Sequence, residues 1–266
     1  MSKSSFFSIA VIIVALFLTS CASSPMNRRQ IVLFSESDMA QQGVQTYQQM
    51  LEQMPLSESQ RKTDYVRCVT NYIVSALDVN QRGDYVWEAS LFENEQANAF
   101  ALPGGKMGVY TGLLNVAINQ HQLATVMAHE VGHVLAQHSN ERASQSTLRN
   151  IGRAVALAAG VSDSTMEVID LGTEYGLFLP FNRTQESEAD QIGIMLMARA
   201  GFDPQESINL WQNMSEQGGS RPPELLSTHP SPASRINELN RLLPPAEALW
   251  ASANAGGIVP DCRPPF

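Results

Sequence analysis

Basic residues are scarce in this sequence. Its 266 residues include 17 Lys and Arg against 26 Asp and Glu, so the formal net charge at pH 7 is −9. An acidic chain without a basic patch is a poor partner for nucleic acid, and we expect no such partner. Charged residues make up 16% of the chain and hydrophobic residues 44%. These proportions are typical of a folded globular protein and argue against a disordered one.

Long hydrophobic runs are also few. The main one, Phe6–Leu18, is shorter than the roughly 20 residues that a membrane-spanning helix needs. Lys3 precedes this run and small residues follow it, which is the pattern of a secretory signal peptide over residues 1–20. The sequence Leu18-Thr19-Ser20-Cys21 also resembles a bacterial lipobox, so we expect Cys21 to carry a lipid. A plain signal peptide with an incidental cysteine is the alternative.

The residue after this cysteine bears on the cellular location of the protein. Position 22 is Ala and not Asp. By resemblance to the bacterial sorting pattern, this favours an outer-membrane lipoprotein that faces the periplasm. Residues 21–34 are then expected to be a lipid-anchored tether, and residues 35–266 a single folded domain that meets the membrane through its N-terminal anchor.

Cysteine is rare, with three residues in the chain. If Cys21 is acylated, Cys68 and Cys262 remain, an even number in an oxidising compartment. We predict a disulfide between them. It would join the Pro-rich C-terminal tail to an N-terminal helix and could add about 4 kcal/mol of stability. Two unpaired thiols are the alternative.

The hydrophobic periodicity predicts a mostly helical α+β domain. Apolar positions at helical spacing and turn residues between them place helices at 35–54, 57–79, 122–138, 140–159, 164–178, 184–200, 204–216 and 232–242. Alternating or β-branched stretches predict strands at 85–92, 98–102 and 106–111. We expect the three strands to form one small, largely antiparallel sheet that precedes the helix at 122–138.

Histidine is rare too, but two of the five lie in His129-Glu130-Val131-Gly132-His133. On a helix, His129 and His133 share one face, which is the spacing that two zinc ligands need. Glu130 would flank the metal, take a proton from water and deliver it to the leaving amine. Two surface histidines on an amphipathic helix are the alternative. Gly132 in mid-helix costs about 1 kcal/mol and indicates close packing against another element.

A third ligand must come from elsewhere in the chain. Ser139 stands where a third histidine would complete the extended motif, and His138 is better explained as a cation at the end of a helix. Glu186 and Asp190 are four apart and share a helix face, so one could bind zinc while the other orients a ligand histidine. Glu188 would face elsewhere, in solvent. Spacing alone does not decide between Glu186 and Glu188.

Four segments in order carry a family resemblance over roughly residues 65–243. They are Asn98-Ala99-Phe100-Ala101 with Pro103-Gly104-Gly105, His129 to His133, Arg183 to Asp190, and Ser227-Thr228-His229-Pro230 followed by Arg235. With them the chain resembles the zinc metallopeptidase family that includes HtpX and the CAAX prenyl proteases, most closely its periplasmic BepA- and LoiP-like lipoproteins.

The resemblance implies a zincin-type domain with one Zn²⁺ per chain. It makes Glu186 the third ligand and Asp190 the partner of a ligand histidine. It also places Asn98 and Ala99 on an edge strand that pairs with extended substrate backbone. Binding of this kind depends mainly on backbone hydrogen bonds and little on the side chains of the substrate.

His229 has several possible roles. A histidine in a Thr-His-Pro loop is, by itself, more often structural. The resemblance instead places His229 over the zinc cleft, where it would stabilise an oxyanion or cap the metal in a resting state, supported by Arg235. The sequence does not choose between these two roles.

We therefore expect a zinc-dependent metalloendopeptidase that acts on unfolded or misassembled cell-envelope proteins, alongside the outer-membrane assembly machinery. One alternative is an assembly factor or holdase for outer-membrane proteins with a gated or weakly active protease site. Another is a zinc hydrolase of cell-wall peptides. A serine hydrolase is poorly supported, because the chain has no Gly-x-Ser-x-Gly elbow.

Overall fold

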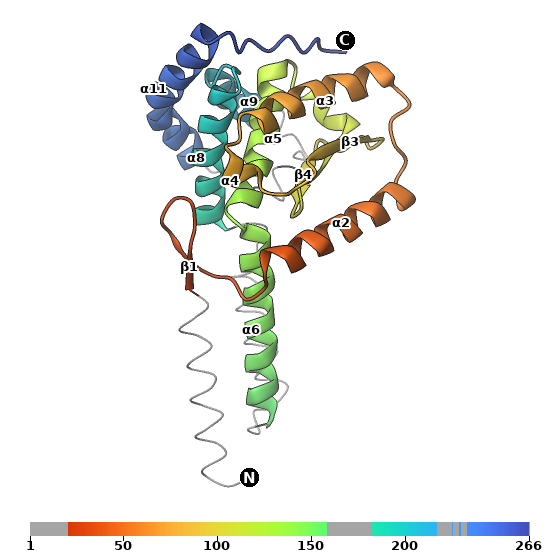
Figure 1. The fold of residues 1–266 in the computed structure, drawn as a ribbon, viewed down its shortest axis with the longest axis vertical. Coiled ribbons are helices and arrows are strands. Elements are labelled where there is room, and N and C mark those ends of the chain that lie inside the picture. The colour runs from red at the N-terminus through yellow and green to blue at the C-terminus, as the bar shows by residue number, and fades with distance from the viewer. Residues whose placement is uncertain (1–20, 159–181, 217–224, 226–228, 230–232, 266) are drawn as a thin grey trace.

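The computed structural model describes residues 21–158, 182–216, 225, 229 and 233–265. The expected signal peptide and the helix predicted at 164–178 lie outside these residues. The described elements, drawn in Figure 1, are β1 (Cys21–Ser23), β2 (Arg29–Ile31), α2 (Glu36–Gln53), α3 (Gln60–Ser75), α4 (Val79–Arg82), β3 (Glu88–Phe92), β4 (Ala99–Leu102), β5 (Lys106–Tyr110), the 3-10 turn η1 (Thr111–Asn115), α5 (Gln120–Leu135), α6 (His138–Ala158), α8 (Arg183–Arg199), α9 (Gln205–Glu216) and α11 (Ala233–Ala255). The mostly helical α+β class is confirmed.

Helix α5 lies at the centre of the domain. Every residue from Gln122 to His133 is buried, because α3, β4, α8 and α9 surround the helix. The closest neighbour is α8. A Cβ atom on Gly132 would lie 2.9 Å from the backbone oxygen of Ala189, and one on Gly193 would lie 3.0 Å from the backbone nitrogen of His129. The mid-helix glycine that the sequence contains is therefore required by close contact between two helix backbones.

The sheet differs from expectation in its strand directions. Its order is β3-β5-β4, with β4 antiparallel to β5 but β3 parallel to β5. The turn at residues 103–105 makes β4 and β5 a hairpin, and β5 inserts between β4 and β3, so that β3 and β5 run the same way. The sheet is mixed and not largely antiparallel. A second sheet, the two-stranded β1–β2 hairpin, was also not expected.

The N-terminal segment is folded against the domain. After the β1–β2 hairpin, the backbone nitrogen of Leu33 donates to Ser144 Oγ at 2.8 Å, and Asn140 Nδ2 donates to the Phe34 carbonyl at 2.8 Å. Both partners belong to α6, which projects away from the body of the domain in Figure 1. Residues 21–34, expected as a tether, thus contain a docked hairpin. Lipidation of Cys21 stays a prediction.

The last helix is longer than predicted. The sequence suggested an end near residue 242, before Pro244 and Pro245, yet α11 continues through both prolines to Ala255. Its second half is held by packing, since Ala246 and Ala253 are buried, and Trp250 Nε1 donates to the Gly201 carbonyl at 3.0 Å. These tertiary contacts offset the two missing backbone donors.

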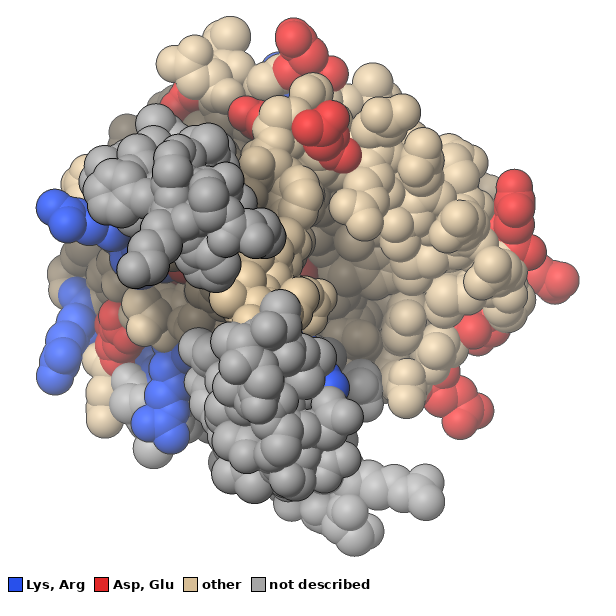
Figure 2. Space-filling model, turned by 90° about the horizontal axis from the view of Figure 1, so that it is seen from below, with Lys and Arg blue, Asp and Glu red and all other residues tan. Residues whose placement is uncertain are grey.

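The surface carries charges of both signs. Seen from below, Lys and Arg gather mainly on one side of the molecule and Asp and Glu mainly on the other (Figure 2). The described part of this face shows no continuous basic surface. Among the residues that the structure describes, no helix combines the length and the apolar character needed to cross a membrane.

A disulfide joins α3 to the C-terminal tail. Cys68 on α3 is bonded to Cys262 in the C-terminal tail, with 5.7 Å between the Cα atoms. The bond closes a loop of 194 residues, and long loops gain most from closure in the chain-entropy model. Beside it, the backbone nitrogen of Cys262 donates to Gln120 Oε1 at 2.8 Å, which places the tail at the start of α5.

We expect the double variant Cys68→Ser/Cys262→Ser to unfold more easily. The free energy of unfolding should fall by up to about 4 kcal/mol, because the unfolded chain regains its loop freedom. Urea unfolding followed by circular dichroism measures this change. Wild-type protein treated with a reductant serves as the control and should match the variant. Equal urea midpoints for oxidised wild type and the variant would contradict the prediction.

Candidate metal centre

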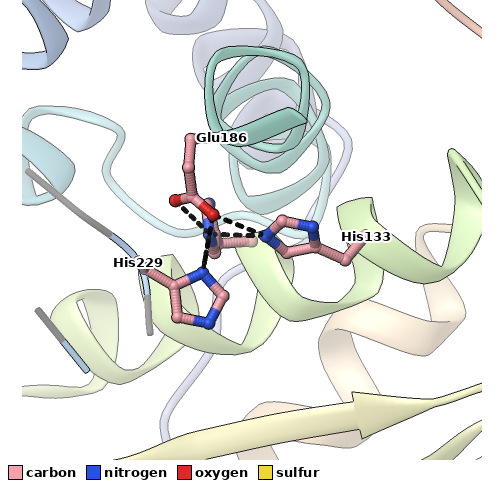
Figure 3. A group of neighbouring side chains, drawn as sticks. His133, Glu186 and His229 are labelled. Atoms are coloured by element: carbon pink, nitrogen blue, oxygen red, sulfur yellow. Dashed lines mark hydrogen bonds and ion pairs between the residues drawn. The ribbon is translucent and has the colours of Figure 1, made fainter. Parts of the chain in front are cut away.

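Four side chains from three parts of the chain converge on one buried point. His129 and His133 come from one face of α5, Glu186 from the first turn of α8, and His229 is a described residue between α9 and α11 in sequence. Each is at most 3% exposed. Figure 3 shows His133, Glu186 and His229 pointing toward one another. The structure thus brings together the two motif histidines, the glutamate and His229, all of which the sequence singled out.

The distances between the donor atoms fit a metal ion at their centre. His129 Nε2 lies 3.0 Å from His133 Nε2 and 3.2 Å from His229 Nδ1. Glu186 Oε1 lies 2.9 Å from His229 Nδ1 and 3.4 Å from His133 Nε2. A tetrahedral ion with ligands at about 2.0–2.1 Å keeps its ligand atoms roughly 3.3–3.4 Å apart. Three imidazole nitrogens this close to one another and to a carboxylate form a donor set suited to such an ion.

His129 is oriented by a carboxylate and an arginine. Its Nδ1 lies 3.0 Å from Asp190 Oδ1, and Arg235 from α11 holds Asp190 through two nitrogens, Nε on Oδ2 and NH2 on Oδ1. Burial and the nearby arginine would lower the pKa of His129, but Asp190 and Glu186 raise it to about 9. The pKa of Asp190 stays low despite burial, because Arg235 stabilises its charge.

The arginine has a second contact. Its guanidinium lies 3.9 Å from the ring centre of Trp211 on α9, and the same ring meets His129 edge to face with 6.3 Å between centroids. Trp211 is fully buried and packs behind the site, where it supports both Arg235 and His129. Sequence reasoning did not find this residue, because α9 carries no motif.

His133 is backed by a second histidine. Its Nδ1 lies 2.8 Å from His138 Nδ1, and His138 Nε2 lies 3.1 Å from Glu188 Oε2. The interpretation of His138 as a cation at a helix end was wrong. This residue is fully buried at the start of α6, and burial lowers its pKa, so it stays neutral. Gln137, with a left-handed φ of 54°, turns the chain back and brings His138 behind the motif.

The expectation that Glu188 faces solvent was also wrong, since its side chain is buried and only 4% exposed. Burial alone would raise its pKa, but hydrogen bonds from His138, Ser24 and Arg28 lower it to about 2. Its face of α8 is covered by the N-terminal hairpin, which local periodicity could not reveal. Glu188 therefore helps to hold His133 in place through His138. Glu186 instead belongs to the donor cluster, the group of ligand atoms from His129, His133, Glu186 and His229.

Glu130 lies beside the cluster and outside it. Its Oε1 is 3.4 Å from His229 Nε2, and burial raises its pKa above the usual value. The backbone of Ala101 on β4 hydrogen-bonds the carboxylate. Glu186, in contrast, keeps a strongly lowered pKa, because the three histidines around it outweigh the effect of burial. The two glutamates thus differ in charge preference, as a proton carrier and a ligand would.

Strand β4 forms one edge of the sheet and lies against α5. Ala99 pairs with Val109 of β5, and the Asn98 carbonyl accepts from Tyr110 N at 3.0 Å. Asn98 therefore bonds toward β5, whereas the Ala99 N–H donates to Asn98 Oδ1 at 3.0 Å. No described strand lies on the other side of β4. Asn98 and Ala99 thus lie at the start of the edge strand whose Ala101 backbone hydrogen-bonds Glu130, and their contact with substrate stays a prediction.

A helix with a His-Glu-x-x-His motif, a glutamate from a later helix and a neighbouring edge strand define a zincin-like α+β metallopeptidase domain. The comparison with known families agrees. Residues 60–243 match the model of Peptidase family M48, and the chain belongs to that family. The resemblance stated from the motifs is confirmed by this match and by relatives of the BepA type.

The relatives include mitochondrial and bacterial proteins. The chain is 35% identical over 226 residues to the mitochondrial metalloendopeptidase OMA1 of Schizosaccharomyces pombe, covering 83% of this chain and 66% of that protein. It is 30% identical over 274 residues to the Bos taurus metalloendopeptidase OMA1, covering 96% and 52%. It is 35% identical over 169 residues to the beta-barrel assembly-enhancing protease of Escherichia coli K12, covering 58% and 34%. The chain spans about half the length of the relatives that it matches first.

The raised pKa of His129 predicts that metal binding releases a proton. At neutral pH the metal-free ring is protonated, since its pKa is about 9, and an ion displaces that proton. The apparent affinity should rise roughly tenfold per pH unit from neutral pH to about 9 and level off above it. Calorimetry in buffers of different ionisation enthalpy counts the protons. An affinity that does not change with pH over this window would contradict the prediction.

Proposed function

We propose that the chain is a zinc-dependent metalloendopeptidase. The observation that carries the proposal is the convergence of His129, His133 and Glu186, with the general-base candidate Glu130 beside them. Two imidazoles and one carboxylate form the ligand set of a catalytic zinc, which leaves a position for water or substrate. Other divalent ions accept the same donors, so metal analysis belongs to the test. One Zn²⁺ per chain is the expected stoichiometry.

Glu130 is the proposed proton carrier. Zinc bound to the three ligands would acidify a water molecule and polarise the scissile carbonyl. Glu130 accepts the proton of the attacking water and donates it to the leaving amine nitrogen. A pKa raised by burial suits this double role, because a carboxylate that is a weaker acid than usual accepts a proton more readily before it passes the proton on. Asp190 and Arg235 keep His129 in the orientation needed for binding.

The edge strand supports an extended polypeptide as the substrate. An incoming chain could add to β4 at Asn98 and Ala99, with its backbone held near Glu130. Such strand addition depends little on the amino-acid sequence of the substrate, so it suits unfolded or misassembled proteins. The name of the beta-barrel assembly-enhancing relatives favours cell-envelope substrates and an association with outer-membrane assembly. We propose that Cys21 carries the lipid anchor and that the protein faces the periplasm from the outer membrane.

The position of His229 favours a gated site. Its Nδ1 lies within hydrogen-bonding distance of both His129 Nε2 and Glu186 Oε1, where it would take the place of water or substrate. Arg235 NH1 lies 3.5 Å from the His229 carbonyl, which supports this position of His229. We therefore favour the capping role over oxyanion stabilisation. A closed site also keeps open the second candidate function, an assembly factor or holdase whose cellular role does not need cleavage.

The variant Glu130→Gln tests the main proposal. Cleavage of unfolded casein should fall at least about 100-fold, because the proton carrier is lost, while metal analysis should still find one zinc per chain. Glu247→Gln, which alters an exposed residue of α11, is the matched control and should cleave like wild type. Peptidoglycan fragments assayed in parallel address the cell-wall alternative. No stoichiometric metal and no cleavage that depends on Glu130 would overturn the proposal. A cellular role that survives Glu130→Gln would favour the holdase.

The variant His229→Ala distinguishes the two roles of this histidine. If His229 caps the metal, its removal frees the fourth position and casein cleavage rises. A fall of 100-fold or more would instead indicate an oxyanion donor. Initial rates at saturating substrate, together with zinc content, provide the measurement, and Glu130→Gln/His229→Ala serves as the inactive control.

A further inference from the structure

A second arginine stands behind the site, at the opposite end of the chain from Arg235. Arg28 lies in the β1–β2 hairpin, between the two strands. Figure 1 places this hairpin at the lower end of α8, beside the start of α6. Each of the two helices contributes a buried carboxylate there, Glu188 from α8 and Glu141 from α6. The hairpin therefore covers a polar cluster directly behind the metal ligands.

Arg28 binds both carboxylates at once. Its NH1 and NH2 meet the two oxygens of Glu141 at 2.7 Å each, and its Nε donates to Glu188 Oε2 at 2.8 Å. Two parallel bonds to one carboxylate fix the plane of the guanidinium and thereby aim Nε at Glu188. Both glutamates are 4% exposed, so a positively charged partner is needed to offset the loss of water around their charges.

The hydrogen bonds beyond Glu188 run in one direction. A carboxylate only accepts, so Glu188 Oε2 receives the Nε2 proton of His138. His138 Nδ1 then carries a lone pair and accepts from His133 Nδ1. This leaves the lone pair of His133 at Nε2, the atom that faces the donor cluster. The oxygen that Arg28 holds is the same one that His138 binds, and the tautomers of both rings follow from it.

We propose that Arg28 is a positioning residue for the metal ligand His133, and that the N-terminal hairpin is therefore part of the metal site. Arg28 acts through Glu188 and His138 and touches neither metal nor substrate. It corresponds in role to Arg235, which holds Asp190 behind His129. The inference rests on the proposed metal site, and it adds a dependence of that site on the segment that follows Cys21.

Removal of the arginine should weaken metal binding. In Arg28→Ala, Glu188 loses the donor that fixes Oε2, so His138 and His133 gain rotational and tautomeric freedom. Loss of such outer contacts typically reduces metal affinity about 10–100-fold. The matched control is Arg29→Ala, which removes the same charge from an exposed neighbour and should bind zinc like wild type. Titration against a zinc chelator gives the dissociation constants of all three proteins.

A second measurement does not depend on zinc. Nitrogen-15 spectra of the imidazoles in metal-free protein at alkaline pH should show His133 protonated at Nδ1 and His138 at Nε2 in wild type and in Arg29→Ala. Both populations should become mixed in Arg28→Ala. A contribution to folding alone would leave the two tautomers unchanged. If wild type binds no zinc, the proposed function fails, but the tautomers still decide the role of Arg28.

The variant Glu188→Gln covers the case in which Arg28→Ala does not fold. The amide keeps the size of the side chain but weakens both hydrogen bonds at Oε2, so the losses in zinc affinity and in tautomer order should be similar. If both variants fold, the double variant should show little further loss, since the two residues act in one chain of contacts. Zinc affinity within twofold of wild type in a folded Arg28→Ala or Glu188→Gln protein, with wild-type tautomers, would overturn the proposal.

Discussion

The contact between α5 and α8 is the constraint on which the site depends. At Gly132 and Gly193 neither helix has a side chain, and a single added carbon would meet the backbone of the other helix at about 3 Å. Because the backbones come so close, the short carboxylates of Glu186 and Asp190 reach the imidazoles of α5 from across the interface. Any larger residue at the two glycines would move the helices apart and separate the donor atoms. The packing of the core and the geometry of the metal centre are therefore one requirement.

Features that follow from local periodicity were accessible from the sequence. His129 and His133 lie one helical turn apart, so their common face needs no knowledge of the rest of the fold. Glu186 and Asp190 share a face for the same reason. The family resemblance was nevertheless needed to prefer Glu186 over Glu188 as the third metal ligand. The pairing of Cys68 with Cys262 followed from counting, since one candidate pair remained once Cys21 was set aside.

Features that depend on distant segments were missed. Nothing near His138 reveals that a left-handed residue at Gln137 folds it behind the motif. Glu188 was expected in solvent, because the face of α8 that it occupies is covered by a hairpin more than 150 residues away in the chain. The direction of β3 and the continuation of α11 through Pro244 are also settled by packing, which outweighs local preference.

The two arginines have a consequence for synthesis. One lies at position 28 and the other at position 235, and the ligands that they support lie between them in sequence. A growing chain that has not yet added α11 lacks the partner of Asp190, so its first ligand histidine is not held in place. The metal centre therefore takes its final form only after α11 has been made and has packed against α8. Because Arg235 follows Asp190 in the chain, the orientation of His129 is a late event when the chain folds as it is synthesised.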